Sequence, residues 1–539
     1  MLNCKQYRIL ALYSFLSIGI ISGCGGGSDT QEQENQLAAA TPVPAAASDI
    51  ALQNLINANN LEAFAADSVD LPSIDSSVAQ LGKKLFFAKN LGGEQSVACV
   101  SCHHPMLGGA DELSLPVGVA PVNQFDHNSH ALLGEGRFNG NHANNLPVVP
   151  RNAPTVFNIG LNDEVVFWDG RIQRLANGGI STPDSGQNIS DTNLPAGISL
   201  ANAQARFPIT SAAEMRGEFE TQTDNQTLRS ILAGRFDNSN ADFQSTWRQE
   251  FEPVFGDQNI DFDEIAHALG EYERSMLFVN NAWQAYLLGQ NDALTEQQKQ
   301  GAILFFTPTN QGGAGCSQCH SGTTLSDSEH HLVAFPQLGP GKGNDDGVVT
   351  ANATSADFGR ENISGNQQDR YHFRTPTLLN IATSAPYGHA GAYQTLQEVV
   401  RHYINPQNEI DRLFAAQAGL PFSRGSAPVC QLPQFADIIE KNNVTCESLL
   451  ENAYENSSNA AAHLQQARSG MVQASAILDN NARLNGNEVN QIVAFLEALT
   501  DPCVLDRDCM SPWIIDGDDV AEYPDANPLV ATDLQGIEL

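Results

Sequence analysis

The sequence predicts an all-α protein made of two similar helical domains with long loops. Apolar residues recur at helical spacing, whereas alternating strand patterns are scarce. The segment Leu-Gly-Lys-Lys-Leu-Phe-Phe at 81–87 is echoed by Lys-Gln-Gly-Ala-Ile-Leu-Phe-Phe at 299–306, which indicates two copies of one unit with a boundary near 277–294. The clearest helical stretches are 77–87, 262–276, 295–306 and 487–499.

The first residues have the features of an export signal. Lys5 and Arg8 precede an apolar stretch at 9–21 that is too short to span a bilayer comfortably. The ending Ile-Ser-Gly-Cys resembles the lipobox of bacterial lipoproteins, which implies cleavage before Cys24 and lipidation of its thiol; an ordinary cleaved signal is the alternative. Gly25 replaces the acidic residue typical of inner-membrane lipoproteins, so we expect export to the periplasmic face of the outer membrane.

Composition and chain length indicate the kinds of partner and the division into domains. The formal net charge of −35 argues against nucleic acid as a partner and is usual for a solvated surface. We expect the chain to meet a membrane only through its lipid anchor. The expected parts are a signal peptide at 1–23, a flexible linker at 24–50, an N-terminal domain at 51–280, a C-terminal domain at 281–502 and an acidic tail at 503–539.

Each of two C-x-x-C pairs is followed directly by a histidine, in Cys99-Val-Ser-Cys102-His103 and Cys316-Ser-Gln-Cys319-His320. This is the attachment motif of haem c, because two thiols on one helical turn can bond both vinyl groups of a porphyrin while the next imidazole reaches the iron. A zinc site from two C-x-x-C knuckles needs no trailing histidine and places its pairs closer together, and a thioredoxin-like redox pair is the other alternative. We therefore expect two covalently bound haem c groups, each with the motif histidine on its iron.

The remaining cysteines form an even set outside the signal. In an oxidising compartment such a set predicts disulfides, and three connectivities exist. Short loops favour the pairs Cys430–Cys446 and Cys503–Cys509.

With these motifs the chain resembles the bacterial di-haem cytochrome c peroxidases and their MauG-type relatives, from about residue 81 to residue 512. The resemblance rests on Arg-Asn-Ala-Pro-Thr-Val-Phe-Asn at 151–158, Phe-Trp-Asp-Gly-Arg at 167–171, Pro208 with Glu214-Met215, Phe-Arg-Thr-Pro-Thr-Leu-Leu-Asn at 373–380 and Ala-Pro-Tyr-Gly-His-Ala-Gly at 385–391. It implies two cytochrome c-like domains, of which the N-terminal haem reacts with hydrogen peroxide and the C-terminal haem handles electrons.

The resemblance also assigns roles to single residues. It makes Glu214 the group that moves a proton between the peroxide oxygens, in a pocket shaped by Pro208. It places Trp168 between the haems as an electron relay. The alternatives are that Glu214 is a solvated carboxylate at a helix start and that Trp168 is a core aromatic. Asn152 and the backbone around Ser384 and Pro386 match the calcium site of the family.

The second haem offers the most discriminating position. In this family its outer ligand lies fourteen residues after the histidine of Pro-Tyr-x-His-x-Gly, and is methionine in electron-accepting peroxidases but tyrosine in MauG-type enzymes. From His389 this count reaches Tyr403, and none of the six methionines lies near it. A thioether raises the haem potential, whereas a phenolate stabilises oxidised iron. Neighbouring His402 is the alternative ligand.

Three features depart from the family pattern. The loop between His103 and Trp168 is enlarged, and the open side of the first haem could be occupied by one of its histidines or by none. Segments 340–370 and 405–485 are long and could dock a partner or cover surface. The tail after residue 512 matches nothing in the family. The histidines of the enlarged loop are His104, His127, His130 and His142.

Three functions are compatible with these observations. The first is a MauG-like oxidase that uses hydrogen peroxide and oxidises a partner protein through the C-terminal haem. The second is a conventional peroxidase that takes electrons from a cytochrome c or a cupredoxin. The third is a non-enzymatic di-haem electron carrier. Tyr403 favours the first, and Glu214 in its pocket argues against the third.

Overall fold

The computed structural model describes residues 47–539 except 66–68, 120–148, 238–245, 257–258, 339–355, 416–428, 444, 447–449, 451, 479–481, 516–518, 521–522, 526 and 532–537. The expected signal peptide, Cys24 and nearly all of the linker lie outside the described residues. No helix in the described part is both long enough and apolar enough to cross a bilayer.

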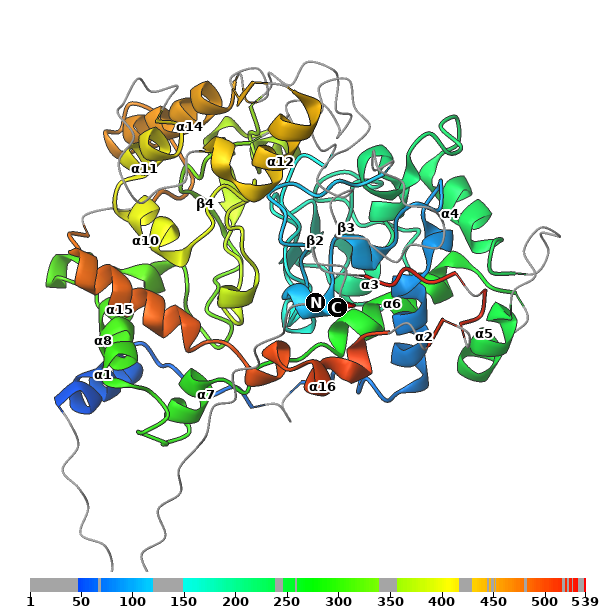
Figure 1. Cartoon of the computed structure of the whole chain (residues 1–539), viewed down its shortest axis with the longest axis horizontal. Coiled ribbons are helices and arrows are strands. Elements are labelled where there is room, and N and C mark those ends of the chain that lie inside the picture. The colour runs from blue at the N-terminus through cyan, green and yellow to red at the C-terminus, as the bar shows by residue number, and fades with distance from the viewer. Residues whose placement is uncertain are drawn as a thin grey trace, which may run out of the picture. The chain divides into compact units, whose positions relative to one another are not determined.

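The described chain is mainly helical, as the sequence predicts, and it also contains two small antiparallel sheets (Figure 1). The sheets have the orders β1-β2-β3 and β4-β5, and their strands are only two or three residues long, too short for a periodic pattern in the sequence. The strands are β1 (Val165–Val166), β2 (Ile172–Arg174), β3 (Ile180–Ser181), β4 (His330–Leu332) and β5 (His372–Arg374). The helices are α1 (Ala47–Ala58), α2 (Ser77–Phe87), α3 (Leu200–Gln204), α4 (Asn225–Ala233), α5 (Trp247–Phe255), α6 (Phe262–Arg274), α7 (Ala282–Leu287), α8 (Glu296–Phe306), α9 (Glu361–Ser364), α10 (Leu396–Ile404), α11 (Pro406–Leu413), α12 (Pro433–Asn442), α14 (Ala453–Arg468), α15 (Gly486–Glu497) and α16 (Arg507–Met510).

Both copies of the echoed segment form the same kind of helix crossing. Gly82 of α2 faces α6, where an added Cβ would lie 1.9 Å from the carbonyl oxygen of Ala268. Gly301 of α8 faces α15, where an added Cβ would lie 1.9 Å from the carbonyl oxygen of Gln491. In each copy the missing side chain lets two helices approach closely, and the phenylalanine pair that ends the segment is buried.

Two matching asparagines, one in each half of the chain, donate hydrogen bonds to the same carbonyl group. Asn158 and Asn380 end two of the motifs that carry the family resemblance, and both adopt positive φ angles, 60° and 62°. Their side-chain amides donate to the carbonyl oxygen of Phe278, at 3.1 Å and 2.9 Å. Phe278 lies in the boundary region that the sequence indicates. The two halves of the chain are therefore joined by symmetric hydrogen bonds at this residue.

The buried apolar side chains form two large clusters. One surrounds α2 and α6 and includes Met510 and Leu529 from the C-terminal segment. The other surrounds α8 and α15 and includes Leu52 of α1. Each cluster therefore contains a segment from the far end of the chain, as α1 beside α8 shows in Figure 1.

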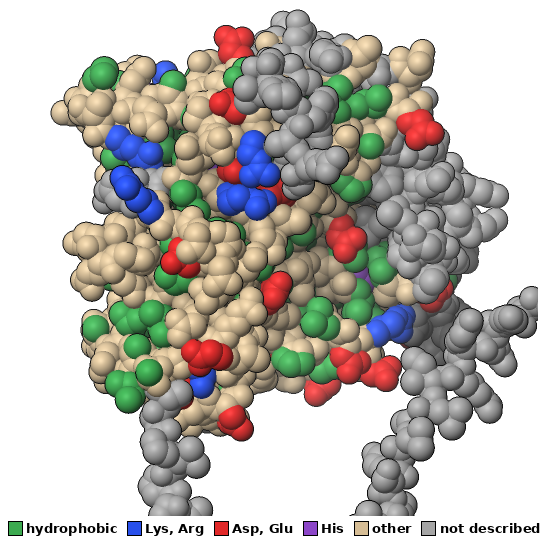
Figure 2. All heavy atoms as spheres, turned by 60° about the vertical axis from the view of Figure 1, so that its left-hand side comes forward, with side chains coloured by type: hydrophobic (Ala, Val, Ile, Leu, Met, Phe, Trp, Pro, Cys, Tyr) green, Lys and Arg blue, Asp and Glu red, His purple; other side chains and the backbone are tan. Residues whose placement is uncertain are grey.

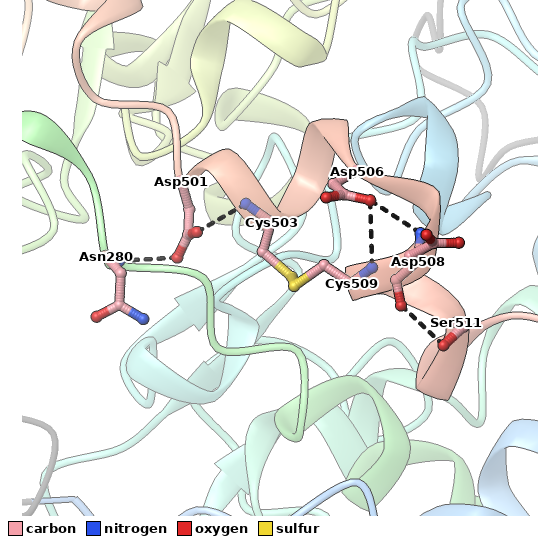
Figure 3. The surroundings of a disulfide bond; sticks show 7 residues. All are labelled: Asn280, Asp501, Cys503, Asp506, Asp508, Cys509 and Ser511. Atoms are coloured by element: carbon pink, nitrogen blue, oxygen red, sulfur yellow. Dashed lines mark hydrogen bonds between the residues drawn. A yellow bond between two sulfur atoms is a disulfide. The ribbon is translucent and has the colours of Figure 1, made fainter.

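The structure confirms both disulfides favoured by short loops, Cys430–Cys446 and Cys503–Cys509. Figure 3 shows how the second one is anchored. The carboxylate of Asp501 accepts hydrogen bonds from the backbone N–H groups of Asn280 (2.8 Å) and Cys503 (3.0 Å). The C-terminal segment is thereby attached to the chain that leads from one half into the other.

Replacing Gly82 or Gly301 by alanine should lower the stability of the haem-loaded protein by about 1–3 kcal/mol, because the new methyl group would overlap a backbone carbonyl oxygen of the crossing helix. Thermal unfolding measures this change. Gly486→Ala is the matched control, since Gly486 begins α15 and its added Cβ would meet nothing within 4 Å. Equal unfolding temperatures for Gly82→Ala and Gly486→Ala would contradict the close crossing.

Candidate functional site

A single cavity of about 380 Å³ is lined by residues of both C-x-x-C-H motifs. Its wall is mostly apolar and also includes Trp168, Glu214 and Tyr403. The structure thus brings together, around one space, the candidate residues that the sequence places far apart. Such a concave, mainly apolar site with a few polar groups is typical of a bound cofactor.

The two haem-attachment motifs have the same local form. Each begins a single 3₁₀ turn, Cys99–Ser101 or Cys316–Gln318, which places the two thiols of a motif on one turn. None of these four cysteines is in a disulfide, and all four line the cavity. No disulfide therefore consumes the thiols of either motif, as their bonding to a porphyrin requires.

The motif histidines are oriented by backbone carbonyl groups. Nδ1 of His103 lies 3.2 Å from the carbonyl oxygen of Gly109, and Nδ1 of His320 lies 3.0 Å from that of Leu325. If Nδ1–H donates in each contact, Nε2 remains as the nitrogen that can bind iron. Burial lowers the pKa of both imidazoles, which favours the neutral form that a metal requires.

Two threonines hold these carbonyl segments in the same way. The hydroxyl of Thr155 donates to the carbonyl oxygen of Gly108 (2.6 Å), one residue before the partner of His103. The hydroxyl of Thr377 donates to the carbonyl oxygen of Thr324 (2.7 Å), one residue before the partner of His320. Each Pro-Thr motif therefore supports the histidine of its own half.

Two buried polar atoms in the cavity wall are consistent with a site that a bound cofactor completes. Oε2 of Glu273 and Nε2 of His389 have no hydrogen-bond partner among the described residues, and both side chains line the cavity. Burial raises the pKa of Glu273 to about 8. No motif in the sequence marks Glu273, because this residue lies in an ordinary amphipathic helix, α6. Together with the four cysteine thiols and the oriented imidazoles, these atoms fit two haem c groups.

Glu214 lies in the single turn Ala212–Arg216, directly after the turn Pro208–Thr210. The hydroxyl of Ser211 accepts the backbone N–H of Glu214 (3.3 Å), which fixes the start of this turn. Burial raises the pKa of the Glu214 carboxyl, while the charge of Arg171 opposes this shift. Glu214 and Pro208 both line the cavity, so the carboxyl does not belong to a freely solvated helix start.

Trp168 is held at both its side chain and its backbone. The indole N–H donates to the carbonyl oxygen of Asn152 (2.9 Å), and the backbone N–H of Arg374 donates to the carbonyl oxygen of Trp168 (2.8 Å). Because Asn152 and Arg374 belong to different halves of the chain, the indole is fixed where the halves meet.

A buried ion-pair cluster next to Trp168 was not foreseen from the sequence. The guanidinium of Arg151 lies 2.6 Å from Asp169 and 2.7 Å from Asp357, and all three side chains are buried. Although burial opposes ionisation, Arg151 lowers the pKa of Asp169 to about 2. Asp357 lies in the long segment 340–370 outside every motif, so nothing in the sequence pairs it with Arg151.

Tyr403 and His402 have different surroundings on α10. Tyr403 lines the cavity, packs its ring against Phe335 with centroids 5.6 Å apart, and has its pKa raised by burial. His402 is buried, and its Nε2 lies 2.9 Å from the carbonyl oxygen of Val333. Its Nδ1 lies 2.8 Å from the hydroxyl of Tyr393. Both ring nitrogens of His402 thus have hydrogen-bond partners, and His402 is not part of the cavity wall.

The structure describes the enlarged loop at residues 104–119 and 149–167. His104 is buried beside Phe87, and its Nδ1 accepts the backbone N–H of Met106 (3.1 Å). Burial lowers the pKa of His104 to about 3, and this residue is not part of the cavity wall. The other three candidates, His127, His130 and His142, lie outside the described residues.

The expected calcium ligands are close to the same cavity. Asn152, Ser384 and Pro386 all contribute to its wall. The side-chain amide of Asn152 donates to the carbonyl oxygen of Leu113 (2.9 Å). Calcium binding stays a prediction from the resemblance.

Comparison with known proteins gives consistent matches. The family model of di-haem cytochrome c peroxidases matches residues 76–292. Cytochrome c551 peroxidase of Pseudomonas aeruginosa is 30% identical, over 62% of this chain and 73% of the relative. Its counterpart in Nitrosomonas europaea is 26% identical, over 67% and 83%. Methylamine utilization protein MauG of Methylorubrum extorquens is 26% identical, over 60% and 67%.

The similarity covers most of the length of these relatives, and both haem-attachment motifs line one cavity with none of their cysteines in a disulfide. From the matches and from the position of both motifs in one cavity wall we conclude that the chain belongs to the di-haem cytochrome c peroxidase family and is a peroxidase-type oxidoreductase with two c-type haems.

Proposed function

We propose that this protein uses hydrogen peroxide to oxidise a partner protein, with Tyr403 as the outer ligand of the second iron. The position of Tyr403 in the cavity wall carries this proposal, because His402 is not part of that wall and both of its ring nitrogens are bound, by Val333 and Tyr393. Among the described residues of that wall the only methionine is Met215, next to Glu214. A phenolate stabilises oxidised iron, which suits the storage of oxidising equivalents better than the acceptance of electrons.

The chemistry divides between the haems and the side chains. The haems, held by the two C-x-x-C-H motifs, would supply the iron for peroxide cleavage at the first site and for storing oxidising equivalents at the second. The carboxylate of Glu214 takes the proton from one peroxide oxygen and returns it to the departing oxygen. Pro208 forms a rigid part of the same wall and adds no N–H donor. The pKa of Glu214, raised by burial, makes the carboxylate a better proton acceptor than an exposed one.

Trp168 supplies an oxidisable ring where the two halves meet. Its N–H is bound to the neutral carbonyl group of Asn152, a weak base that holds the ring in place without removing the proton. A fixed indole in this position is suited to relay an electron from one half to the other.

The partner and the location follow from the same proposal. The substrate would be an exported protein with an oxidisable tryptophan or tyrosine near its surface. Lipidation of Cys24 would hold the enzyme at the periplasmic face of the outer membrane. On the face drawn in Figure 2 the acidic side chains are dispersed and basic side chains lie among them, so no single sign of charge defines a docking patch there.

A second candidate function is the reduction of peroxide with electrons from a small cytochrome c or a cupredoxin. The similarity to two cytochrome c551 peroxidases favours it, and the identities do not separate these relatives from MauG. The third hypothesis, an electron carrier without enzymatic activity, is disfavoured by the family and by Glu214 in the cavity wall.

Glu214→Gln should slow the reaction of the fully oxidised protein with hydrogen peroxide by about 10²–10⁴-fold, because an amide cannot accept the proton. Stopped-flow spectroscopy at equal haem content measures this rate. The matched control is Glu218→Gln, which changes an exposed carboxylate four residues later in the chain. Equal rates for native protein and Glu214→Gln would remove Glu214 from the mechanism.

The pH dependence of kcat/KM should show an acid limb that belongs to Glu214. Because burial raises the pKa of this carboxyl above its ordinary value of 4.5, the active carboxylate is lost as the pH falls through a midpoint above 4.5. In Glu214→Gln the limb should disappear. A limb that persists unchanged in this variant must come from another group.

Tyr403→Met should abolish the near-infrared band that we expect when the oxidised native protein is titrated with hydrogen peroxide, because the phenolate no longer stabilises oxidised iron. Optical and EPR titrations follow both haems. Tyr454→Met, which alters a tyrosine of α14 outside the cavity wall, should keep the band. If the native protein shows no band and turns over peroxide only after half-reduction by a cytochrome donor, the second candidate function is correct.

A further inference from the structure

Segment 113–119 is a buried loop next to the first haem-attachment motif. All seven of its residues are buried, and Pro116 lines the cavity. The side chain of Asn152 donates to the carbonyl oxygen of Leu113 and so holds the start of the loop (2.9 Å). Because a buried loop must find partners for its backbone groups within the protein, its contacts determine where it lies.

The end of this loop pairs with the turn that carries Glu214. The backbone N–H of Val119 donates to the carbonyl oxygen of Ala213 (3.2 Å), the residue directly before Glu214. Gly118 has a φ of +71°, and an added Cβ would lie 2.1 Å from the same carbonyl oxygen. Only glycine permits this close approach. The position of the loop therefore sets the position of the turn.

Gln434 holds the middle of the loop from the other half of the chain. Its side-chain N–H donates to the carbonyl oxygen of Leu115 (2.7 Å), and its side-chain oxygen accepts the N–H of Leu115 (3.0 Å). Gln434 is only 2% exposed. One side-chain amide thus satisfies both backbone groups of a buried residue, as a neighbouring strand would.

Helix α12, which carries Gln434, is itself firmly placed. Leu432, Phe435 and Ile438 are buried in the cluster around α8 and α15. The disulfide Cys430–Cys446 closes the chain around the helix. This part belongs to the long segment 405–485, for which the sequence leaves the alternatives of docking a partner and covering surface.

We infer that Gln434 is a positioning residue of the peroxide site, which holds the turn carrying Glu214 through segment 113–119. The connection runs from the Gln434 amide to Leu115, along the loop to Val119, and from there to Ala213. The inference deepens the proposed function and rests on it, since it assumes that Glu214 acts on peroxide. It gives the disulfide-closed part of the insertion, residues 430–446, a role inside the enzyme.

The test compares Gln434→Leu with the native protein, both with two haems attached. Leucine has a similar size but leaves the N–H and carbonyl groups of Leu115 buried without partners, so amide exchange in 113–119 should rise roughly tenfold or more. The acid limb of kcat/KM should shift, because Glu214 leaves its buried position. Hydrogen exchange resolved by mass spectrometry and the pH profile give the two readouts.

Two further variants keep the test decisive. Gln434→Glu retains an acceptor for the N–H of Leu115 and should give a smaller rise in exchange, which also covers the case in which Gln434→Leu fails to fold. Glu440→Gln changes an exposed residue of the same helix and should match the native protein. Unchanged exchange in Gln434→Leu, or raised exchange with an unmoved acid limb, overturns the inference. Full peroxide activity in Glu214→Gln would instead overturn the proposed function, while raised exchange in Gln434→Leu would still show that Gln434 holds the loop.

Discussion

The arrangement of the cavity depends on the ion pairs that the buried guanidinium of Arg151 forms. The guanidinium contacts Asp169, directly after Trp168, and Asp357 from the second half of the chain. Two ionised carboxylates surround a charge that would be very costly to bury alone, and removing Arg151 would leave both carboxylates buried without this partner. Because Asp169 and Asp357 come from different halves of the chain, the cluster connects the two halves.

The groups around Arg151 extend this constraint to the chemistry. The backbone N–H of Asn152, the next residue, donates to the carbonyl oxygen of His389 (2.8 Å), and the carbonyl group of Asn152 accepts the indole N–H of Trp168. His389 stacks on Phe373 with ring centroids 3.8 Å apart. Trp168 is thus placed by a chain of bonded neighbours and not by apolar packing alone, as the proposed electron relay would require.

The sequence predicts those features that depend on a periodic pattern or on residues close together in the chain. The helices at 77–87 and 295–306, the haem-attachment turns and both disulfides depend on residues close together in the chain. The partners Arg151–Asp357 and Leu115–Gln434 are 206 and 319 residues apart and lack any local pattern, so folding alone reveals them. A position count pointed to Tyr403, and its place in the cavity wall together with the hydrogen bonds of His402 distinguishes it from its neighbour.

Hydrogen bonds and apolar packing hold the two halves of the chain together. Asn158 and Asn380 share the carbonyl oxygen of Phe278, and each hydrophobic cluster includes a segment from the far end of the chain. Sliding one half past the other would break these bonds and expose apolar surface, so motion at this junction is costly. Electron transfer between fixed sites gains from such rigidity, whereas a hinged pair of domains would vary the distance. The same construction places Gln434 of the second half where it can bond Leu115 of the first.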